Sequence, residues 1–179
     1  RTMGALAEDE ALMKLDGGTT LDHRRACRPF AENCGFTLAE ASQFVILFDD
    51  ELALALGAHI YSGVADVFVN ADGYKKSIPG PGIGNYLTVG KAMGTVKAIL
   101  GEKALKDRSY MQAHGTGTPQ NRVTESHIFD AMASAFGIDH WPVAAIKAYL
   151  GRSLACASGD QIIASLGVWQ DGIIPGIVT

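Results

Sequence analysis

The sequence predicts an α/β fold in which helices cover a largely parallel sheet. Three observations support this class. Short apolar runs rich in β-branched and aromatic residues, typical of strands buried on both faces, recur along the 179 residues. Stretches with apolar residues at helical spacing separate these runs. The chain also has 21 glycines, many of them at the boundaries where turns and helix ends are expected.

The expected elements alternate in chain order. Strands are predicted at residues 44–48, 60–69, 110–113 and 142–146, and helices at residues 51–56, 88–100, 120–136 and 153–170. Asp49 suits the N-cap of the first helix, and Gly57 suits its end. Thr88 is placed at the start of the second helix, and Gly137 closes the third. The glycine- and proline-rich stretch 70–86 has no periodicity and is expected to be a functional loop or disordered.

Each long helix presents a set of apolar residues at helical spacing. The sets are Val89, Met93, Val96 and Leu100; Ile128, Phe129, Met132 and Phe136; and Leu154, Ile162, Leu166 and Trp169. We expect these faces to pack on the sheet.

Composition excludes several classes of protein. Hydrophobic residues make up 47% and charged residues 19%, which is too apolar for a disordered chain. Fifteen basic against nineteen acidic residues give a net charge of −4, and a nucleic-acid-binding protein normally has a basic excess. The longest apolar run, residues 44–48, is far too short to cross a bilayer, and no signal peptide is seen. The first residue is Arg1, which indicates a processed chain or a piece of a longer one.

The three cysteines, Cys27, Cys34 and Cys156, cannot all pair within one chain. Cys27 and Cys34 have no neighbouring histidines and fit no common zinc spacing, so no metal site is expected. Reduced thiols in a cytoplasmic protein are the simplest interpretation.

Two predicted strands end in polar residues that can carry chemistry. His114 follows the strand at 110–113, and Lys147 follows the strand at 142–146. Ligands of α/β proteins bind at the carboxyl ends of parallel strands, where a histidine can exchange a proton near neutral pH and a lysine can supply positive charge. The alternative is that both residues are only structural: His114 would cap the end of its strand, and Lys147 would extend its charged end to the surface. Residues 114–119, His-Gly-Thr-Gly-Thr-Pro, favour a site because their glycines allow close backbone approach and Thr116 and Thr118 offer hydroxyls.

These motifs resemble a known family. Residues 112–119, Gln-Ala-His-Gly-Thr-Gly-Thr-Pro, are similar to the Asn-Ala-His-Gly-Thr-(Ser/Gly)-Thr-Pro block of the β-ketoacyl-acyl-carrier-protein synthases. Glu125 falls where that block is usually followed by a glutamate. Residues 147–152, Lys-Ala-Tyr-Leu-Gly-Arg, correspond to the family's Lys-Ser-x-x-Gly-His, and residues 28–30, Arg-Pro-Phe, begin a further matching segment. The chain therefore resembles the C-terminal half of these condensing enzymes.

The resemblance implies a thiolase-like fold, whose C-terminal half has a βαβαβαβ arrangement with a mixed sheet covered by helices. Residues 1–179 would be this half, incomplete at both ends. The implied activity is an acyl transfer, the decarboxylative Claisen condensation of malonyl-acyl-carrier-protein with an acyl primer in fatty-acid or polyketide synthesis. The implied partners are an acyl carrier protein, an N-terminal half that carries the nucleophilic cysteine, and a second copy in a homodimer. No cofactor is needed beyond the phosphopantetheine arm on the carrier protein.

The resemblance also assigns roles to individual residues. His114 would donate to the developing enolate, Lys147 would organise the surrounding charges, and Glu125 would support Lys147. Thr116 and Thr118 would hold the phosphopantetheine arm. Arg152 stands at the position of the family's second histidine, and an arginine stays cationic where that histidine is neutral.

Because of Arg152, a non-catalytic partner subunit that shapes an acyl pocket or dimerises with an active subunit is kept as the alternative. Cys156 lies in a setting that superficially copies the family's nucleophile, but its position nine residues after Lys147 predicts an inert, packed thiol in the last helix. A degradative thiolase is disfavoured because its C-terminal Cys-x-Gly motif is absent. This segment alone is expected to be inactive.

Two further motifs are weaker indications of a binding function. Residues 80–84, Gly-Pro-Gly-Ile-Gly, hint at a dinucleotide-binding loop, but Asn85 stands where the last glycine is needed and no strand precedes the loop. Small basic clusters are either solvated surface or a docking site for an acidic carrier protein: Arg24, Arg25 and Arg28, and Lys75 with Lys76.

Overall fold

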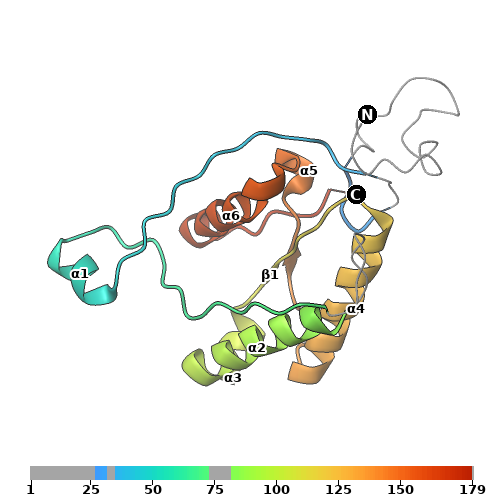
Figure 1. Cartoon of the computed structure of the whole chain (residues 1–179). Coiled ribbons are helices and arrows are strands. Elements are labelled where there is room, and N and C mark those ends of the chain that lie inside the picture. The colour runs from blue at the N-terminus through green and yellow to red at the C-terminus, as the bar shows by residue number, and fades with distance from the viewer. Residues whose placement is uncertain (1–26, 32–34, 73–81, 179) are drawn as a thin grey trace, which may run out of the picture.

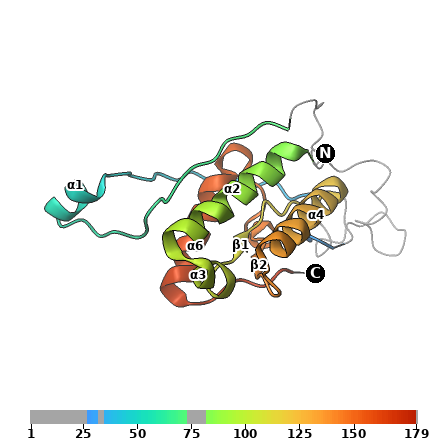
Figure 2. The ribbon, with the colours of Figure 1, turned by 90° about the horizontal axis from the view of Figure 1, so that it is seen from below.

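The structure is a computed structural model that describes residues 27–31, 35–72 and 82–178. Its elements in chain order are α1 (Asp50–Ala55), α2 (Ile83–Leu100), α3 (Glu102–Asp107), β1 (Met111–Gln112), α4 (Pro119–Phe136), β2 (Val143–Ala144), α5 (Lys147–Leu150), the 3₁₀ helix η4 (Leu154–Cys156) and α6 (Ala157–Asp171). Strands β1 and β2 pair in parallel, with Met111 opposite Val143 and Gln112 opposite Ala144. Figures 1 and 2 show this small sheet between α6 on one side and α2 with α3 on the other, while α4 runs alongside.

The main hydrophobic core lies where α2, α3 and α4 meet. Met93, Leu105 and Ile138 are its buried centre. Partly buried side chains pack around them: Val89, Val96, Met132, Ala133, Phe136 and Trp141. The apolar faces predicted for residues 88–100 and 120–136 supply most of this cluster, although Leu100 at the end of α2 is exposed.

Residues flanking the two strands form a second buried layer under the site. Ala113, Ala144, Ala145 and Ile146 are all at most 4% exposed. The predicted strands at 110–113 and 142–146 are thus found, in shorter form, as β1 and β2.

The described residues do not form the mixed sheet that the family resemblance implies; they form only the parallel pair β1 and β2. Residues 44–48 and 60–69 adopt no strand structure in the described chain, and most of their side chains are exposed. Phe44 is 92% exposed and Val69 is 88% exposed. A strand needs a neighbour to pair its N–H and C=O groups, and the described residues offer these two segments none. The prediction of strands there is therefore wrong for this chain.

The two unpaired segments carry α1 away from the rest of the protein. In both ribbon views, α1 lies at the tip of a long arm formed by residues 40–70. The Asp49 side chain accepts from Leu52 N at 2.7 Å, and Gly57 follows the helix with a φ of 63°. The predicted helix and both of its ends are confirmed.

Two other helices differ from the prediction at their starts. Helix α2 begins at Ile83, five residues before Thr88. The Thr88 hydroxyl therefore lies inside the helix, where it donates to Gly84 O instead of capping the helix start. The predicted helix 153–170 is split into η4 and α6, and Leu154, the first residue of η4, has a left-handed φ of 57°. Within the described residues, no helix is long and apolar enough to cross a membrane.

Candidate functional site

The backbone around His114 is held on both sides by buried side chains. Glu125 Oε1 accepts from His114 N at 2.6 Å, and Glu125 Oε2 accepts from Gly115 N at 2.7 Å. The Lys147 ammonium donates to the carbonyl of His114. Lys147 and Glu125 are 2% and 8% exposed, so both contacts are shielded from water. The structure thus brings together the two strand-end residues and the glutamate that the sequence singled out.

Gly115 allows the turn that follows His114. Its φ of 54° lies in the left-handed region, and a Cβ there would come within 2.7 Å of the Ala145 side chain. Any other residue would therefore collide with the segment after β2. The glycine lets the two strand ends, and with them His114 and Lys147, lie side by side.

Partial burial and two nearby cations both favour the neutral form of the His114 ring. Partial burial, followed by the nearby Lys147 and Arg152 cations, lowers the pKa of His114 to about 4. The ring retains a solvent-exposed face, and this exposure weakens the lowering without reversing its direction. At pH 7 the site therefore presents an uncharged imidazole between two cations.

Burial moves the pKa values of Lys147 and Glu125 toward each other. Burial lowers the pKa of Lys147 to about 8, although the nearby Glu125 carboxylate opposes that change. Burial raises the pKa of Glu125, against the hydrogen bonds from Gly115, Asn121 and His114. Lys147 remains mostly protonated at pH 7, so it can hold the His114 carbonyl as a cation.

Arg152 is placed by the segment that precedes the arm. Arg152 N donates to Thr37 O at 2.7 Å, and Ala39 N donates to Arg152 O at 3.0 Å. The Arg152 guanidinium lies over the Phe36 ring at 4.8 Å from its centroid, a cation–π contact. Its buried Nε atom has no hydrogen-bond partner among the described residues. The guanidinium is therefore fixed mainly by stacking and is not neutralised by an ion pair in the described structure.

Thr116 and Thr118 lie directly after this turn. Their hydroxyl oxygens are 2.9 Å apart and share a hydrogen bond. Thr116 is only 2% exposed, whereas Thr118 is half-buried and occupies the N-cap position of α4. In this chain Thr118 therefore has the more accessible hydroxyl, and the buried Thr116 hydroxyl is hydrogen-bonded to it.

The described cysteines, Cys27 and Cys156, are both free thiols. Cys27 is buried, and its Sγ donates to Lys147 O at 3.5 Å. Burial raises the pKa of the Cys27 thiol. Cys156 is half-buried at the end of η4, beside the first residue of α6 and not within the helix where the sequence placed it.

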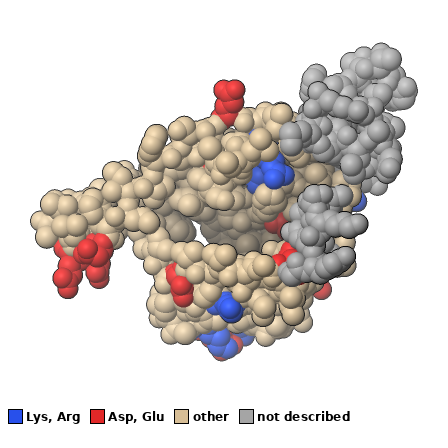
Figure 3. Space-filling view, in the orientation of Figure 1, with Lys and Arg blue, Asp and Glu red and all other residues tan. Residues whose placement is uncertain are grey.

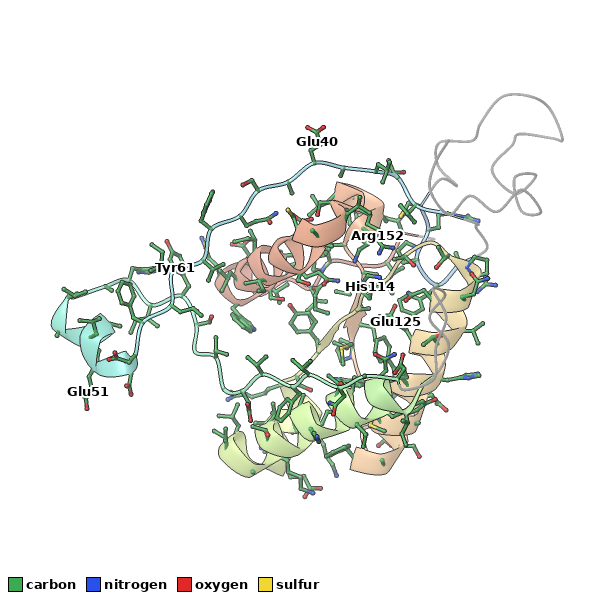
Figure 4. The ribbon with its side chains drawn as sticks, viewed as in Figure 1. Glu40, Glu51, Tyr61, His114, Glu125 and Arg152 are labelled. Atoms are coloured by element: carbon green, nitrogen blue, oxygen red, sulfur yellow. The ribbon has the colours of Figure 1, made fainter. Side chains whose placement is uncertain are left out.

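The site opens on one face of the protein. Figure 3 shows that this face is hollowed near its centre, between α6 and α2. In Figure 4 the side chains of His114, Arg152 and Glu125 gather near the end of β1, whereas Glu40 and Glu51 point away from the protein. A ligand with an extended, partly anionic group would meet the His114 imidazole and the half-buried Arg152 here, whereas the Lys147 ammonium is buried.

Some residues that shape the site were not identified from the sequence. Asn121 Nδ2 donates to Glu125 Oε2, and the Gln161 amide donates to Ala113 O. The spacing of Asn121 four residues before Glu125 on one helix was a usable signal. For Gln161 and for the ring of Phe36, no sequence pattern indicated the contact.

Several candidates from the sequence lie outside the described residues: Arg24, Arg25, Cys34, Lys75, Lys76 and residues 80 and 81. Within the described part of the chain, no cluster of three or more His, Cys, Asp or Glu residues could hold a metal ion.

Comparison with known proteins identifies the family. Residues 61–179 match the family described as beta-ketoacyl synthase, C-terminal domain. The chain is 60% identical over 177 residues to the beta-ketoacyl-[acyl-carrier-protein] synthase FabY of Pseudomonas aeruginosa. This alignment covers 99% of the chain and 28% of that protein. It is 32% identical over 165 residues to the 3-oxoacyl-[acyl-carrier-protein] synthase 2 of Synechocystis sp., covering 87% of the chain and 37% of that protein.

Solved structures agree with this assignment. The crystal structure of the ketosynthase FabY from P. aeruginosa matches with a TM-score of 0.88 at 60% identity, covering 97% of this chain and 27% of that one. A ketosynthase solved in complex with its type II polyketide-synthase acyl-carrier protein matches with a TM-score of 0.67 at 29% identity, covering 89% of this chain and 38% of that one. The chain spans less than two fifths of the length of either curated relative, 28% and 37%. The family match and the shared fold show that the chain belongs to the beta-ketoacyl synthase family and corresponds to the C-terminal domain of these enzymes.

Proposed function

We propose that this domain activates malonyl-acyl-carrier-protein in a decarboxylative condensation of fatty-acid or polyketide synthesis. The malonyl carbon–carbon bond breaks, carbon dioxide leaves, and the electron pair remains as a thioester enolate. The enolate carbon then attacks an acyl group held on a cysteine in the upstream half of the full-length protein, and the cysteine thiolate leaves. The single observation that supports this function best is the placement of His114 just after β1, where Glu125 holds its backbone N–H and Lys147 holds its carbonyl.

His114 acts in this proposal as a hydrogen-bond donor to the enolate oxygen. A neutral imidazole carries one ring N–H that can donate to the enolate oxygen, and its backbone is fixed before the reaction begins. Preorganised donors of this kind are usually the largest contribution to the stabilisation of a developing oxyanion. Lys147 adds positive charge behind the donor, since its pKa of about 8 leaves it mostly protonated at pH 7.

Thr118 receives the phosphopantetheine arm of the carrier protein in this proposal, with Thr116 orienting its hydroxyl. The acidic carrier protein, the upstream half with the nucleophilic cysteine, and a second copy in a homodimer are the proposed partners. We further propose that the full-length protein works in the cytoplasm. The likeness to a ketosynthase solved with its acyl-carrier protein supports the first of these partners.

The proposed role of His114 is tested by measuring carbon dioxide release from malonyl-acyl-carrier-protein in the full-length protein. His114→Ala should reduce the rate by about 10²–10³, the loss typical of removing one oxyanion donor. His127→Ala is the matched control, because His127 is exposed on α4. Equal rates for the two variants would contradict the proposal.

A second candidate function, a non-catalytic partner subunit, is favoured by Arg152. The permanent charge over Phe36 stands where the family has a histidine, and it can pair with the malonyl carboxylate. Such a pair stabilises the ground state and raises the barrier to losing carbon dioxide. If this candidate is correct, the full-length protein should release carbon dioxide slowly and Arg152→His should accelerate it. Equal rates of carbon dioxide release in the parent protein and in Arg152→His would remove the main support for a non-catalytic role.

A further inference from the structure

Two consecutive residues near the start of α6, Asp160 and Gln161, contact both segments that carry the site. The Gln161 side-chain amide donates to Ala113 O, the carbonyl directly before His114. The adjacent Asp160 accepts from the Ser153 hydroxyl, directly after Arg152, and from the Gln43 amide. One helical turn thus contacts the chain neighbours of His114 and Arg152.

The Ala113 carbonyl needs a partner because it is buried where the sheet ends. Ala113 is 1% exposed, and its own N–H is paired with Ala144 O at 2.9 Å. Strand β1 has already ended at Gln112, and the donor to Ala113 O is the side chain of Gln161. A buried carbonyl left without a donor carries a desolvation penalty, so this contact has a specific purpose.

The two peptide groups that flank His114 are each held at both ends. The first contains Ala113 O and His114 N, which contact Gln161 and Glu125 respectively. The second contains His114 O and Gly115 N, which contact Lys147 and Glu125. Because these two peptide planes fix the φ and ψ of His114, they also fix the direction in which its side chain leaves the backbone.

We propose that Gln161 is a positioning residue for His114. It does not touch the reacting atoms; it stops the first peptide group from pivoting about its remaining contact with Glu125. Without the Gln161 donor, that group rotates and the imidazole moves away from the position in which it donates. The catalytic part of this inference rests on the proposed function, whereas the restraint on the backbone does not.

The test compares Gln161→Met with Gln170→Met in the full-length protein. Methionine has a similar length and lacks the amide donor, and Gln170 is exposed near the end of the same helix. Hydrogen exchange is measured at the amides of His114 and Gly115, with Ile128 in α4 as a buried reference. We expect exchange at the two site amides to rise about tenfold in Gln161→Met alone, with Ile128 unchanged.

Turnover supplies a second readout. For malonyl-acyl-carrier-protein decarboxylation, Gln161→Met should lower kcat about tenfold with little change in KM, since the lost contact orients a donor and binds no substrate. Acyl transfer onto the upstream cysteine should stay within about twofold. Exchange at His114 and Gly115 equal to that of Gln170→Met would overturn the proposal, as would a parallel rise at Ile128, which would assign Gln161 to global stability. If the parent protein releases no carbon dioxide, the proposed function fails while the exchange result still decides the backbone restraint.

Discussion

At the scale of single residues, the site depends on Glu125. One buried carboxylate accepts hydrogen bonds from two consecutive backbone N–H groups and from the Asn121 side chain. Burial alone would disfavour its charge, and it does raise the pKa of Glu125. Three donors and the nearby Lys147 offset part of this cost, so a carboxylate is the group that fits this position.

Glu125→Gln should destabilise the protein by about 1–3 kcal/mol. The amide oxygen can still accept a hydrogen bond, but the new NH₂ group must face one of three donors and leaves it unpaired. Removing a buried charge gives back some free energy, which is smaller than the loss at these donors. The free energy of unfolding in urea measures the effect, and Glu40→Gln is the control because Glu40 is exposed. Equal stability of the two variants would refute this assignment of hydrogen bonds.

The sequence predicted the residues of this site better than their contacts. His114, Lys147 and Glu125 were found because strand ends and a specific motif mark them. Gln161 was missed, because whether a glutamine on a helix faces a particular carbonyl depends on how α6 packs against β1. Such packing is a tertiary property that leaves no local pattern.

At the scale of elements, one glycine stabilises the end of its helix and another destabilises the helix that contains it. Gly137 ends α4 in the left-handed region, with φ 63° and ψ 45°, and its N–H caps Ala133 O and Ser134 O. Gly167 lies inside α6, and a Cβ added there would meet no atom within 4 Å. The first position needs glycine, whereas the second gains nothing from it.

Alanine at these two positions should therefore change stability in opposite directions. Gly137→Ala should cost about 1–2 kcal/mol, because a side chain disfavours the left-handed conformation. Gly167→Ala should stabilise by about 0.5–1 kcal/mol, because alanine loses less entropy in a helix. Thermal or urea unfolding of both variants measures the two effects. Changes of the same sign would contradict the element boundaries described above.

Helices were predicted better than strands because a helix satisfies its own backbone. The stretch 120–136 was correct apart from its first residue, since periodicity and Gly137 mark it locally. The runs at 44–48 and 60–69 have the composition of buried strands, yet pairing depends on partners that the described residues do not supply. Apolar runs of this kind predict that a segment is buried, but they do not identify the surface against which it packs.

At the scale of the whole molecule, the arm of residues 40–70 exposes an unusual amount of apolar surface. Side chains more than 70% exposed on it are Phe44, Ile46, Leu47, Leu54, Val67 and Val69. Soluble monomers rarely expose contiguous apolar surface of this extent. The chain spans 28% of the length of its relative from P. aeruginosa, and we propose that the remainder of the full-length protein covers this arm.

The isolated 179-residue chain should therefore bind the dye ANS strongly, and the full-length protein should not. Replacing Phe44 and Val69 by Ser should weaken dye binding to the isolated chain, because these are the two most exposed apolar side chains of the arm. Ile99→Ser, on α2 and outside the arm, is the control. Dye binding that follows Ile99 and not the arm would show that the arm is covered in solution.

The central claim is that the site presents a neutral histidine between two cations. It is tested most directly by following the His114 ring resonances by NMR between pH 8 and pH 4 in the full-length protein. A lowered folded pKa means that the unfolded chain binds the proton first, so proton binding at His114 lowers the stability of the folded protein as pH falls from about 6.5 toward 4. We predict that His114 is mostly unprotonated at pH 5 and titrates with a midpoint near the value of about 4 expected from its surroundings. A midpoint at or above the ordinary value of about 6.5 would contradict the account.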